Sequence, residues 1–278
     1  LHRGGRARGV RARRPDGTAL DVLADTVIVA AGATETPGLL RRSGLGGHPR
    51  LGRNLALHPA AALAGRFDDD VVAWRGVLQS AAVDELHASH GVLIEATSTP
   101  PGMGSMVFPG YGAELLGWLE KATHVATFGA MVADRGVGRV FSLRGETLLR
   151  YNIAPDDTAK LMTALEAMGK LLFAAGAVEV LTGLPAGATV TSLPALQDVL
   201  ARTNPKSLHV AAFHPTGTAA AGADEQRCPV DQHGRLRGVD GVWVADASIL
   251  PSCPEVNPQV SIMALALAVA EGIVASRV

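Results

Sequence analysis

The sequence has 278 residues, of which 47% are hydrophobic and 18% charged, and its formal net charge is −1. This length allows one large domain or two small ones with a full apolar core. The near-neutral balance argues against a disordered chain and against a nucleic-acid partner, whose phosphates would require a basic excess.

The cysteine content and the hydropathy indicate which cellular compartment to expect and whether a membrane-spanning segment is expected. Cys228 and Cys253 are too few and too far apart for a disulfide framework or a CxxC zinc site, which favours a reducing compartment, and the cytoplasm is the expected location. The longest apolar stretch, residues 260–270, is shorter than the ~20 residues of a membrane helix, so no transmembrane segment is expected. Because the sequence starts at Leu1 without a leader pattern, we expect it to be the interior of a longer chain.

The first segment is rich in arginine and alternates in polarity. Val10 and Ala12 fall on one side of a predicted strand, a Pro-Asp-Gly turn follows at residues 15–17, and a second strand runs back through residues 20–22. A basic arm for nucleic acid or membrane is the alternative interpretation. The whole-chain charge offers no supporting basic surface, so a solvated hairpin is favoured.

Residues 26–31 form a short β-branched run that ends in small residues, which is typical of a strand buried on both faces of a parallel sheet. Gly32 and Ala33 follow at its carboxyl end, the edge where open α/β sheets bind ligands. A helix is predicted from Thr34, with Pro37 in its first turn. A strand, a glycine turn and a helix N-terminus together suit an anion or a cofactor phosphate.

Strand-like pieces and irregular stretches alternate from about residue 67 to residue 204, which predicts a separate antiparallel region. The strand-like pieces are residues 91–96, 137–143 and 147–153. The clearest helix begins at Pro155, ends near Gly176 and carries one apolar face made of Leu161, Leu165, Met168 and Leu172.

The loop of residues 100–111 holds several large apolar side chains on a glycine- and proline-rich backbone. These side chains either anchor the core or form a substrate wall, and the residues alone leave both open. The four that would line such a wall are Met103, Met106, Phe108 and Tyr111.

The C-terminal part returns to an α/β pattern. Residues 241–246 read as a strand closed by Asp246, a proline-rich loop follows, and a helix is predicted from Pro258. An acid at a strand end followed by a helix N-terminus again indicates a cofactor edge.

Individual residues are ambiguous when taken one at a time. His214 lies between an aromatic residue and a proline, and a lone histidine of this kind is either structural or catalytic. Asn257 could be the N-cap of the helix behind it. His58 reads as a loop residue, and His87 and His90 lack a third ligand, so no metal site is expected.

Several motifs, in this order along the chain, resemble those of the glucose-methanol-choline (GMC) flavin oxidoreductases. They are residues 32–46 (GATETPGLLRRSGLG) with 51–55 (LGRNL), residues 214–218 (HPTGT), residues 229–248 with their PVD, GRL and GVWVADAS pieces, and residues 257–262 (NPQVSI). The middle is most similar to the long-chain alcohol oxidase branch, through His58-Pro59, residues 130–138 (AMVADRGVG) and residues 174–177 (AAGA).

The resemblance implies an α/β chain, α+β overall, with a partial FAD-binding Rossmann-like domain and an antiparallel-sheet substrate domain. Residues 1–65 and 205–278 would form the FAD-binding parts and residues 66–204 the substrate domain. No G-x-G-x-x-G motif is present, and in the family that motif cradles the FAD pyrophosphate, so the chain is expected to be a fragment of the family's plan.

The resemblance also implies an enzyme that moves hydride from a primary, long-chain alcohol to FAD. His214 would be the base or proton acceptor and Asn257 would hold the alcohol oxygen. Their chemistry fits, because a neutral imidazole accepts a proton near working pH and an amide donates to an alkoxide without adding charge.

The cofactor contacts are implied in the same way. Asp246 and Ala247 resemble the positions that meet the ribityl-phosphate part of FAD, and Gly32 and Ala33 would lie near its adenosine half. The helix N-terminus after Pro258, with Gln259 and Val260, would face the flavin ring.

Two alternatives stay open. One is a non-catalytic remnant or binding module of the same fold, against which the retained His214 and Asn257 argue. The other is a GMC dehydrogenase for a sterol, choline or a sugar. The electron acceptor is either oxygen or a quinone or other carrier.

Overall fold

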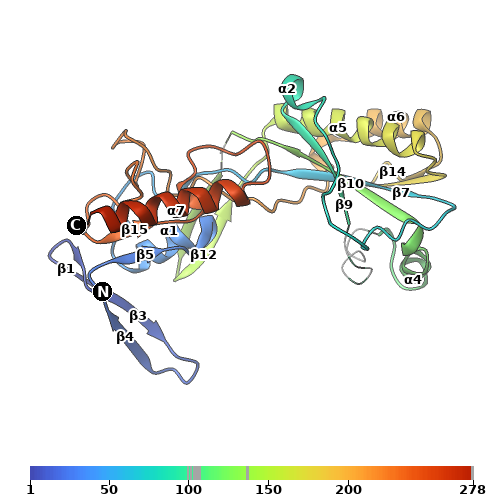
Figure 1. Cartoon of the computed structure of the whole chain (residues 1–278). Coiled ribbons are helices and arrows are strands. Elements are labelled where there is room, and N and C mark those ends of the chain that lie inside the picture. Colours follow the sequence, from blue (N-terminus) through green and yellow to red (C-terminus); the bar gives the residue numbers. More distant parts are fainter. Residues whose placement is uncertain (99, 101, 103–107, 136–137, 277–278) are drawn as a thin grey trace. The chain divides into compact units, whose positions relative to one another are not determined.

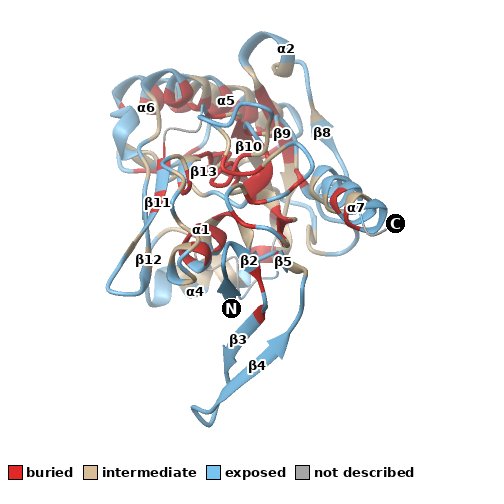
Figure 2. Cartoon of the chain, turned by 90° about the vertical axis from the view of Figure 1, so that its left-hand side faces the viewer, coloured by how far each residue is buried: buried red, intermediate tan, exposed pale blue. Residues whose placement is uncertain are grey.

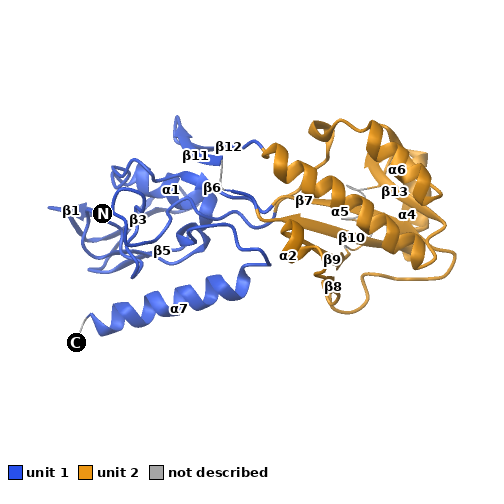
Figure 3. Cartoon of the chain, turned by 90° about the horizontal axis from the view of Figure 1, so that it is seen from above, with its two compact units in different colours: residues 1–58, 134–152, 213–278 blue, residues 59–133, 153–212 orange. Residues whose placement is uncertain are grey.

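The computed structural model describes the whole chain except residues 99, 101, 103–107, 136–137 and 277–278. Its contacts divide the chain into two compact units, drawn in different colours in Figure 3. Unit 1 comprises Leu1–His58, Asp134–Asn152 and Phe213–Val278, and unit 2 comprises Pro59–Ala133 and Ile153–Ala212. The divisions fall after His58 and after Ala212, whereas the sequence leads us to expect them at residues 65 and 204, and residues 134–152 belong to unit 1.

Unit 1 combines short strands with two longer helices (Figure 1). Its elements are β1 (His2–Arg3), β2 (Arg6–Ala7), β3 (Gly9–Arg13), β4 (Ala19–Leu23), β5 (Val27–Val29), α1 (Gly32–Arg42), β6 (Arg53–Leu55), β11 (Gly138–Leu143), β12 (Glu146–Arg150), β15 (Val242–Val244) and α7 (Gln259–Ala275), with a short 3-10 helix at Ala247–Ile249.

The two apolar strands that the sequence predicts at the ends of the chain pair with each other. β5 and β15 run parallel, with Val27 opposite Val242 and Val29 opposite Val244. The N-terminal hairpin is also confirmed: β3 and β4 are antiparallel, nearly every residue of both is exposed, and Arg11 bonds Asp21 at 2.7 Å. Val29, Val242 and Val244 belong to the apolar core of unit 1. Ile28 is 51% exposed, so the prediction that this strand is buried on both faces is wrong.

β6, β11 and β12 form a second sheet in unit 1, in the order β12-β11-β6. The sequence predicts β11 and β12 as part of the middle region, whereas the structure pairs β11 with β6. The guanidinium of Arg41, on α1, donates to the carbonyls of Leu51 and Val140 and so joins α1 to the strands of this sheet. The bond from Arg41 to Val140 joins residues 99 positions apart, which local patterns do not reveal.

Unit 2 is an antiparallel sheet with helices. Its elements are β7 (Ala60–Arg66), β8 (Ala82–Val83), α2 (His87–His90), β9 (Val92–Thr97), α4 (Ala113–Glu120), β10 (Val125–Val132), α5 (Pro155–Ala174), β13 (Glu179–Leu184), β14 (Gly187–Val190) and α6 (Leu193–Arg202), with 3-10 turns at Ala122–His124 and Pro205–Ser207. The strand order is β14-β13-β7-β10-β9-β8, and each neighbouring pair is antiparallel.

Helix α5 anchors the core of unit 2, as its pattern predicts. Pro155 occupies the first turn, where a missing N–H costs nothing, and Asp156 and Asp157 complement the helix dipole. Its apolar face packs against β7 and β10 and is the red, buried band in Figure 2. Gly176, at φ 97°, follows the helix end in the left-handed conformation that favours glycine. Within the described residues, no helix is both long and apolar enough to cross a membrane.

Candidate active site

Asp246 joins the carboxyl ends of the two parallel strands in unit 1. Its carboxylate accepts hydrogen bonds from the backbone N–H of Gly32 at 3.0 Å and from the hydroxyl of Thr36 at 2.6 Å. It also accepts the N–H of Ser248 at 2.7 Å. Asp246 is only 8% exposed, so these bonds lie in a low-dielectric setting where they are strong. The strand ends after β5 and β15 are therefore held together at the edge where the sequence predicts cofactor binding.

The segment 214–218 is tied to the same edge. The Thr218 hydroxyl donates to the carbonyl of Ala33 at 2.6 Å, and the N–H of Gly217 donates to the carbonyl of Ala247 at 3.3 Å. Gly217 has φ 85°, and a Cβ there would stand 2.4 Å from the backbone oxygen of Asn54. Only glycine fits this position, because both the backbone conformation and the space exclude a side chain.

A short antiparallel bridge sets His58 against His214. Ala56 and Thr216 exchange backbone hydrogen bonds of 3.2 and 2.9 Å. Because the bridge is antiparallel, His58, two residues after Ala56, faces His214, two residues before Thr216. The two imidazoles meet through their Nδ1 atoms at 3.0 Å, with ring planes tilted by 41°. His214 is half-buried and His58 is 1% exposed.

Asp134 holds the backbone that carries His58. Its carboxylate accepts the N–H groups of Leu57 and His58 at 3.1 Å each and the hydroxyl of Tyr151 at 2.8 Å. His58 has φ 57°, a left-handed conformation that costs a residue with a Cβ roughly 1–2 kcal/mol. The Asp134 bonds offset this cost and fix the direction in which the His58 ring points.

Burial governs the titration of this cluster. The pKa of His58 is lowered to about 4, chiefly by loss of hydration and then by the charge of His214, while Asp134 opposes the shift. Burial likewise raises the pKa of the nearby Cys253 thiol to about 12, with Asp134 adding to the shift. At neutral pH both groups are therefore uncharged.

Asn257 lies immediately ahead of helix α7 and is half-buried. Pro258 occupies the N-cap position of α7, and no side chain caps that helix end. The alternative interpretation of the sequence, in which Asn257 is the N-cap of this helix, is therefore wrong. Gln259 and Val260 form the exposed start of the helix, whose first turn carries no acidic residue.

The strand edge fits the sugar portion of a dinucleotide better than its phosphates. Gly32 has φ 80°, and a Cβ there would meet no atom within 4 Å, so a ligand can approach the backbone. However, the backbone N–H of Gly32 at the N-terminus of α1 already donates to the carboxylate of Asp246. Glu35 adds a second carboxylate in the first turn of the helix. Negative charge here disfavours a phosphate and suits the hydroxyls of a ribose.

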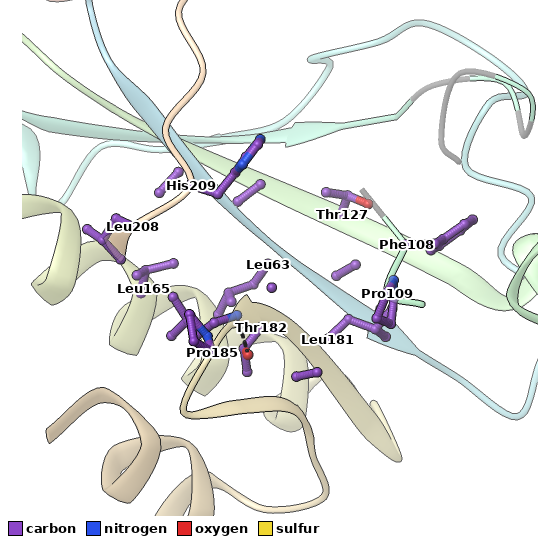
Figure 4. Close-up of a pocket in the computed structure, with 16 residues that line it drawn as sticks. Leu63, Phe108, Pro109, Thr127, Leu165, Leu181, Thr182, Pro185, Leu208 and His209 are labelled. Carbon is purple, nitrogen blue, oxygen red and sulfur yellow. Dashed lines mark hydrogen bonds between the residues drawn. The ribbon is translucent and has the colours of Figure 1, made fainter. Parts of the chain in front are cut away.

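Unit 2 contains an apolar pocket of about 380 Å³ (Figure 4). In the view of Figure 4, Phe108 and Pro109 lie at one end of the pocket and Leu208 and His209 at the other, with Leu63 and Thr182 between them. The lining is mostly alanine, leucine and proline with few polar groups, which is the composition of a site for an apolar ligand.

Of the four residues predicted to form a substrate wall, one lines this pocket, one is exposed to solvent and two lie outside the described residues. Phe108 lines the pocket and stacks on Trp118, with ring centroids 6.2 Å apart. Tyr111 is 88% exposed. Met103 and Met106 lie outside the described residues.

Sequence reasoning missed His58, Asp134 and Tyr151 as neighbours of the candidate site. One signal for His58 was present, because His58-Pro59 repeats the His214-Pro215 dipeptide. Nothing local marks Asp134 or Tyr151, which come from a separate segment of unit 1.

Comparisons with known proteins identify the family of this chain and agree with its fold. The family model described as GMC oxidoreductase matches residues 146–266, and a second model of the same description matches residues 1–60. The chain belongs to the GMC oxidoreductase family, whose members are FAD-dependent.

Individual relatives extend this finding. A GMC-type oxidoreductase of Mycobacterium tuberculosis is 80% identical over 99% of this chain and 44% of its own length. A long-chain-alcohol oxidase of Arabidopsis thaliana is 29% identical over 89% of this chain and 36% of its own length. The chain thus spans less than half the length of these curated relatives.

Solved structures show the same fold. Pyridoxine 4-oxidase from Mesorbium loti superposes with a TM-score of 0.68 at 21% identity, over 97% of this chain and 55% of that one. Formate oxidase of Aspergillus oryzae gives a TM-score of 0.68 at 19% identity, over 97% of this chain and 57% of that one.

Proposed function

We propose that this chain provides the proton-accepting histidine and the substrate pocket of an FAD-dependent oxidase or dehydrogenase of primary alcohols with a long apolar tail. The observation that carries the proposal is the placement of His214, which is half-buried and bonded at Nδ1 to a buried, uncharged histidine. The likeness to long-chain-alcohol oxidases supports the substrate class.

In this proposal His214 accepts the hydroxyl proton of the alcohol, and the amide of Asn257 donates to the alcohol oxygen as charge develops on it. Both residues are in unit 1. FAD, when bound, supplies the acceptor for the hydride that leaves the alcohol carbon. Gly32, Ala33, Asp246 and Ala247 would lie beside its non-flavin part, and the start of α7 at Pro258, Gln259 and Val260 beside its ring.

The pocket of unit 2 favours a substrate with an apolar tail and disfavours a polyol. Its lining is mainly aliphatic, and about 380 Å³ is enough for an alkyl chain. Each methylene buried there would contribute about 0.8 kcal/mol, so specificity should rise with chain length until the pocket is full.

A series of primary alcohols from about two to sixteen carbons, assayed with the flavin-loaded enzyme and an artificial electron acceptor, tests the substrate class. We expect kcat/KM to rise along the series. A flat series, or a preference for a sterol, choline or glucose, would reject the long-chain assignment and favour a GMC dehydrogenase of that substrate.

The role of His214 is tested separately. His214→Ala should lower kcat about 10²–10⁴-fold while the flavin spectrum stays unchanged. If the purified protein shows no flavin absorbance and no alcohol turnover after incubation with FAD, the non-catalytic module is the better assignment.

A further inference from the structure

The contact between His58 and His214 constrains where each ring carries its hydrogen. Two neutral imidazoles whose Nδ1 atoms stand 3.0 Å apart share one hydrogen, so one Nδ1 donates and the other accepts. Among the described residues no group bonds the other ring nitrogen of His58, so its tautomer is set by this contact.

The chemistry of proton acceptance decides which ring donates. Nδ1 of His214 is engaged with His58, so the atom that accepts a proton from an alcohol is Nε2. In a neutral imidazole, Nε2 carries an accepting lone pair only when the ring hydrogen sits on Nδ1. His214 must then donate through Nδ1, and Nδ1 of His58 must accept.

We propose that His58 is a positioning residue that holds His214 in the Nδ1–H tautomer and thereby keeps its Nε2 a proton acceptor for the alcohol. This inference rests on the proposed role of His214. His58 performs the orienting task that a carboxylate performs beside the histidine of a serine hydrolase, but it does so as a neutral acceptor.

The surroundings of His58 keep its ring neutral, so that its Nδ1 atom can accept the hydrogen bond from His214. Its ring is 1% exposed, and the titratable groups near it are His214, Asp134 and Cys253. Burial and the charge of His214 together lower the pKa of His58 to about 4. A protonated His58 would present an N–H to His214 and force the wrong tautomer, so the low pKa protects the arrangement.

The proton balance of the step is simple. The O–H bond of the alcohol breaks, an Nε2–H bond forms on His214, and the Nδ1–H bond of His214 stays intact. The Nδ1–H···N bond to His58 becomes charge-assisted once His214 is an imidazolium, and it strengthens at the moment the proton is taken. His58 gains and loses no proton in this step, because burial holds the pKa of its ring well below neutral pH.

Nitrogen NMR of the full chain labelled with ¹⁵N-histidine tests the tautomer directly. We expect His214 to show a protonated Nδ1 and an unprotonated Nε2, and to show a scalar coupling to Nδ1 of His58 across the hydrogen bond. The spectrum of His214→Gln assigns the signals. A hydrogen on Nε2 of His214 in the wild-type chain would overturn the proposal.

Two substitutions at His58 separate positioning from folding. An asparagine at this position would place an amide oxygen near the former Nδ1 and tolerates the positive φ, so His58→Asn should keep the Nδ1–H tautomer and most of the turnover. His58→Leu removes the acceptor; it should mix the tautomers of His214 and lower kcat about 10–100-fold with little change in KM. His233→Asn, at an exposed histidine of unit 1, is the matched control and should match wild type.

The outcomes distinguish the inference from the proposed function. Loss of activity in His214→Ala, with an unchanged tautomer and unchanged turnover in His58→Leu, would reject only the role of His58. Equal losses in His58→Asn and His58→Leu would also reject it, since they would indicate a packing role. Full activity in His214→Ala would reject the proposed function itself.

Discussion

Asp246 accepts the hydroxyl hydrogen of Thr36 at 2.6 Å across 210 residues of sequence, and both residues are buried. The bond joins the segment after β15 to the first turns of α1. The backbone N–H of Gly32 donates to the same carboxylate oxygen. Asp246 therefore holds together the two segments that form the candidate cofactor edge.

This relationship predicts a graded loss of stability in unit 1. Thr36→Val removes one donor and should lower the free energy of unfolding by about 1–2 kcal/mol, whereas Asp246→Ala leaves three donors without their acceptor and should cost about 3 kcal/mol or more. Urea unfolding measures both. Thr163→Val, at an exposed threonine of α5, is the control and should stay within about 0.5 kcal/mol. Equal effects of the Thr36 and Thr163 substitutions would contradict the prediction.

Acid should destabilise the fold through His58. The folded-state pKa of about 4 lies below the ordinary value of 6.5, so between these pH values the unfolded chain binds a proton that the folded chain does not. Stability is therefore full above about pH 6.5 and falls as the pH drops toward 4, by about 3 kcal/mol in all. His58→Asn should flatten this part of the urea-unfolding profile, and a profile parallel to that of wild type would show that another group is responsible.

The two cysteines should differ in reactivity. Cys253 is 9% exposed and its pKa is raised to about 12, whereas Cys228 is half-buried. Because only the thiolate reacts, the thiolate fraction of Cys253 at about pH 8 is reduced roughly 10³-fold. Mass spectrometry after brief iodoacetamide treatment should find the label on Cys228, with both cysteines labelled in concentrated guanidinium chloride. Labelling of Cys253 first in the native protein would contradict its burial.

Two helical glycines in unit 2 should respond in opposite directions to alanine. A Cβ at Gly169 of α5 would lie 2.0 Å from Cδ2 of Leu196, which is fully buried on α6. Gly169→Ala should therefore destabilise by about 1–3 kcal/mol despite the better helix propensity of alanine. Gly117 of α4 has no atom within 4 Å of such a Cβ, so Gly117→Ala should be neutral or stabilise by up to about 1 kcal/mol.

Leu196→Val provides the second test of this packing. It shortens the side chain that a methyl group at position 169 would strike, so the double variant should be more stable than the sum of the two single changes predicts. Simple additivity of the two changes in thermal unfolding would mean that α5 and α6 do not meet at these residues.

The local elements and the family can be predicted from the amino-acid sequence. Helix α5 and the hairpin β3–β4 follow from periods of 3.6 and 2.0 that lie within one stretch of chain. The strands β5 and β15 each follow from a short apolar run, and the family follows from motifs that keep their order. These signals are local or ordered along the chain, so they can be recognised in the amino-acid sequence alone.

The residues that surround His214 cannot be predicted in this way, because they come together only in the folded chain. His58 and His214 are 156 residues apart, and their contact depends on the register of the bridge between Ala56 and Thr216. Asp134 and Tyr151 come from a third segment, which β11 brings to unit 1 by pairing with β6. A shift of one residue in such a bridge would turn the His58 side chain to the other face, and no local pattern in the sequence specifies that register.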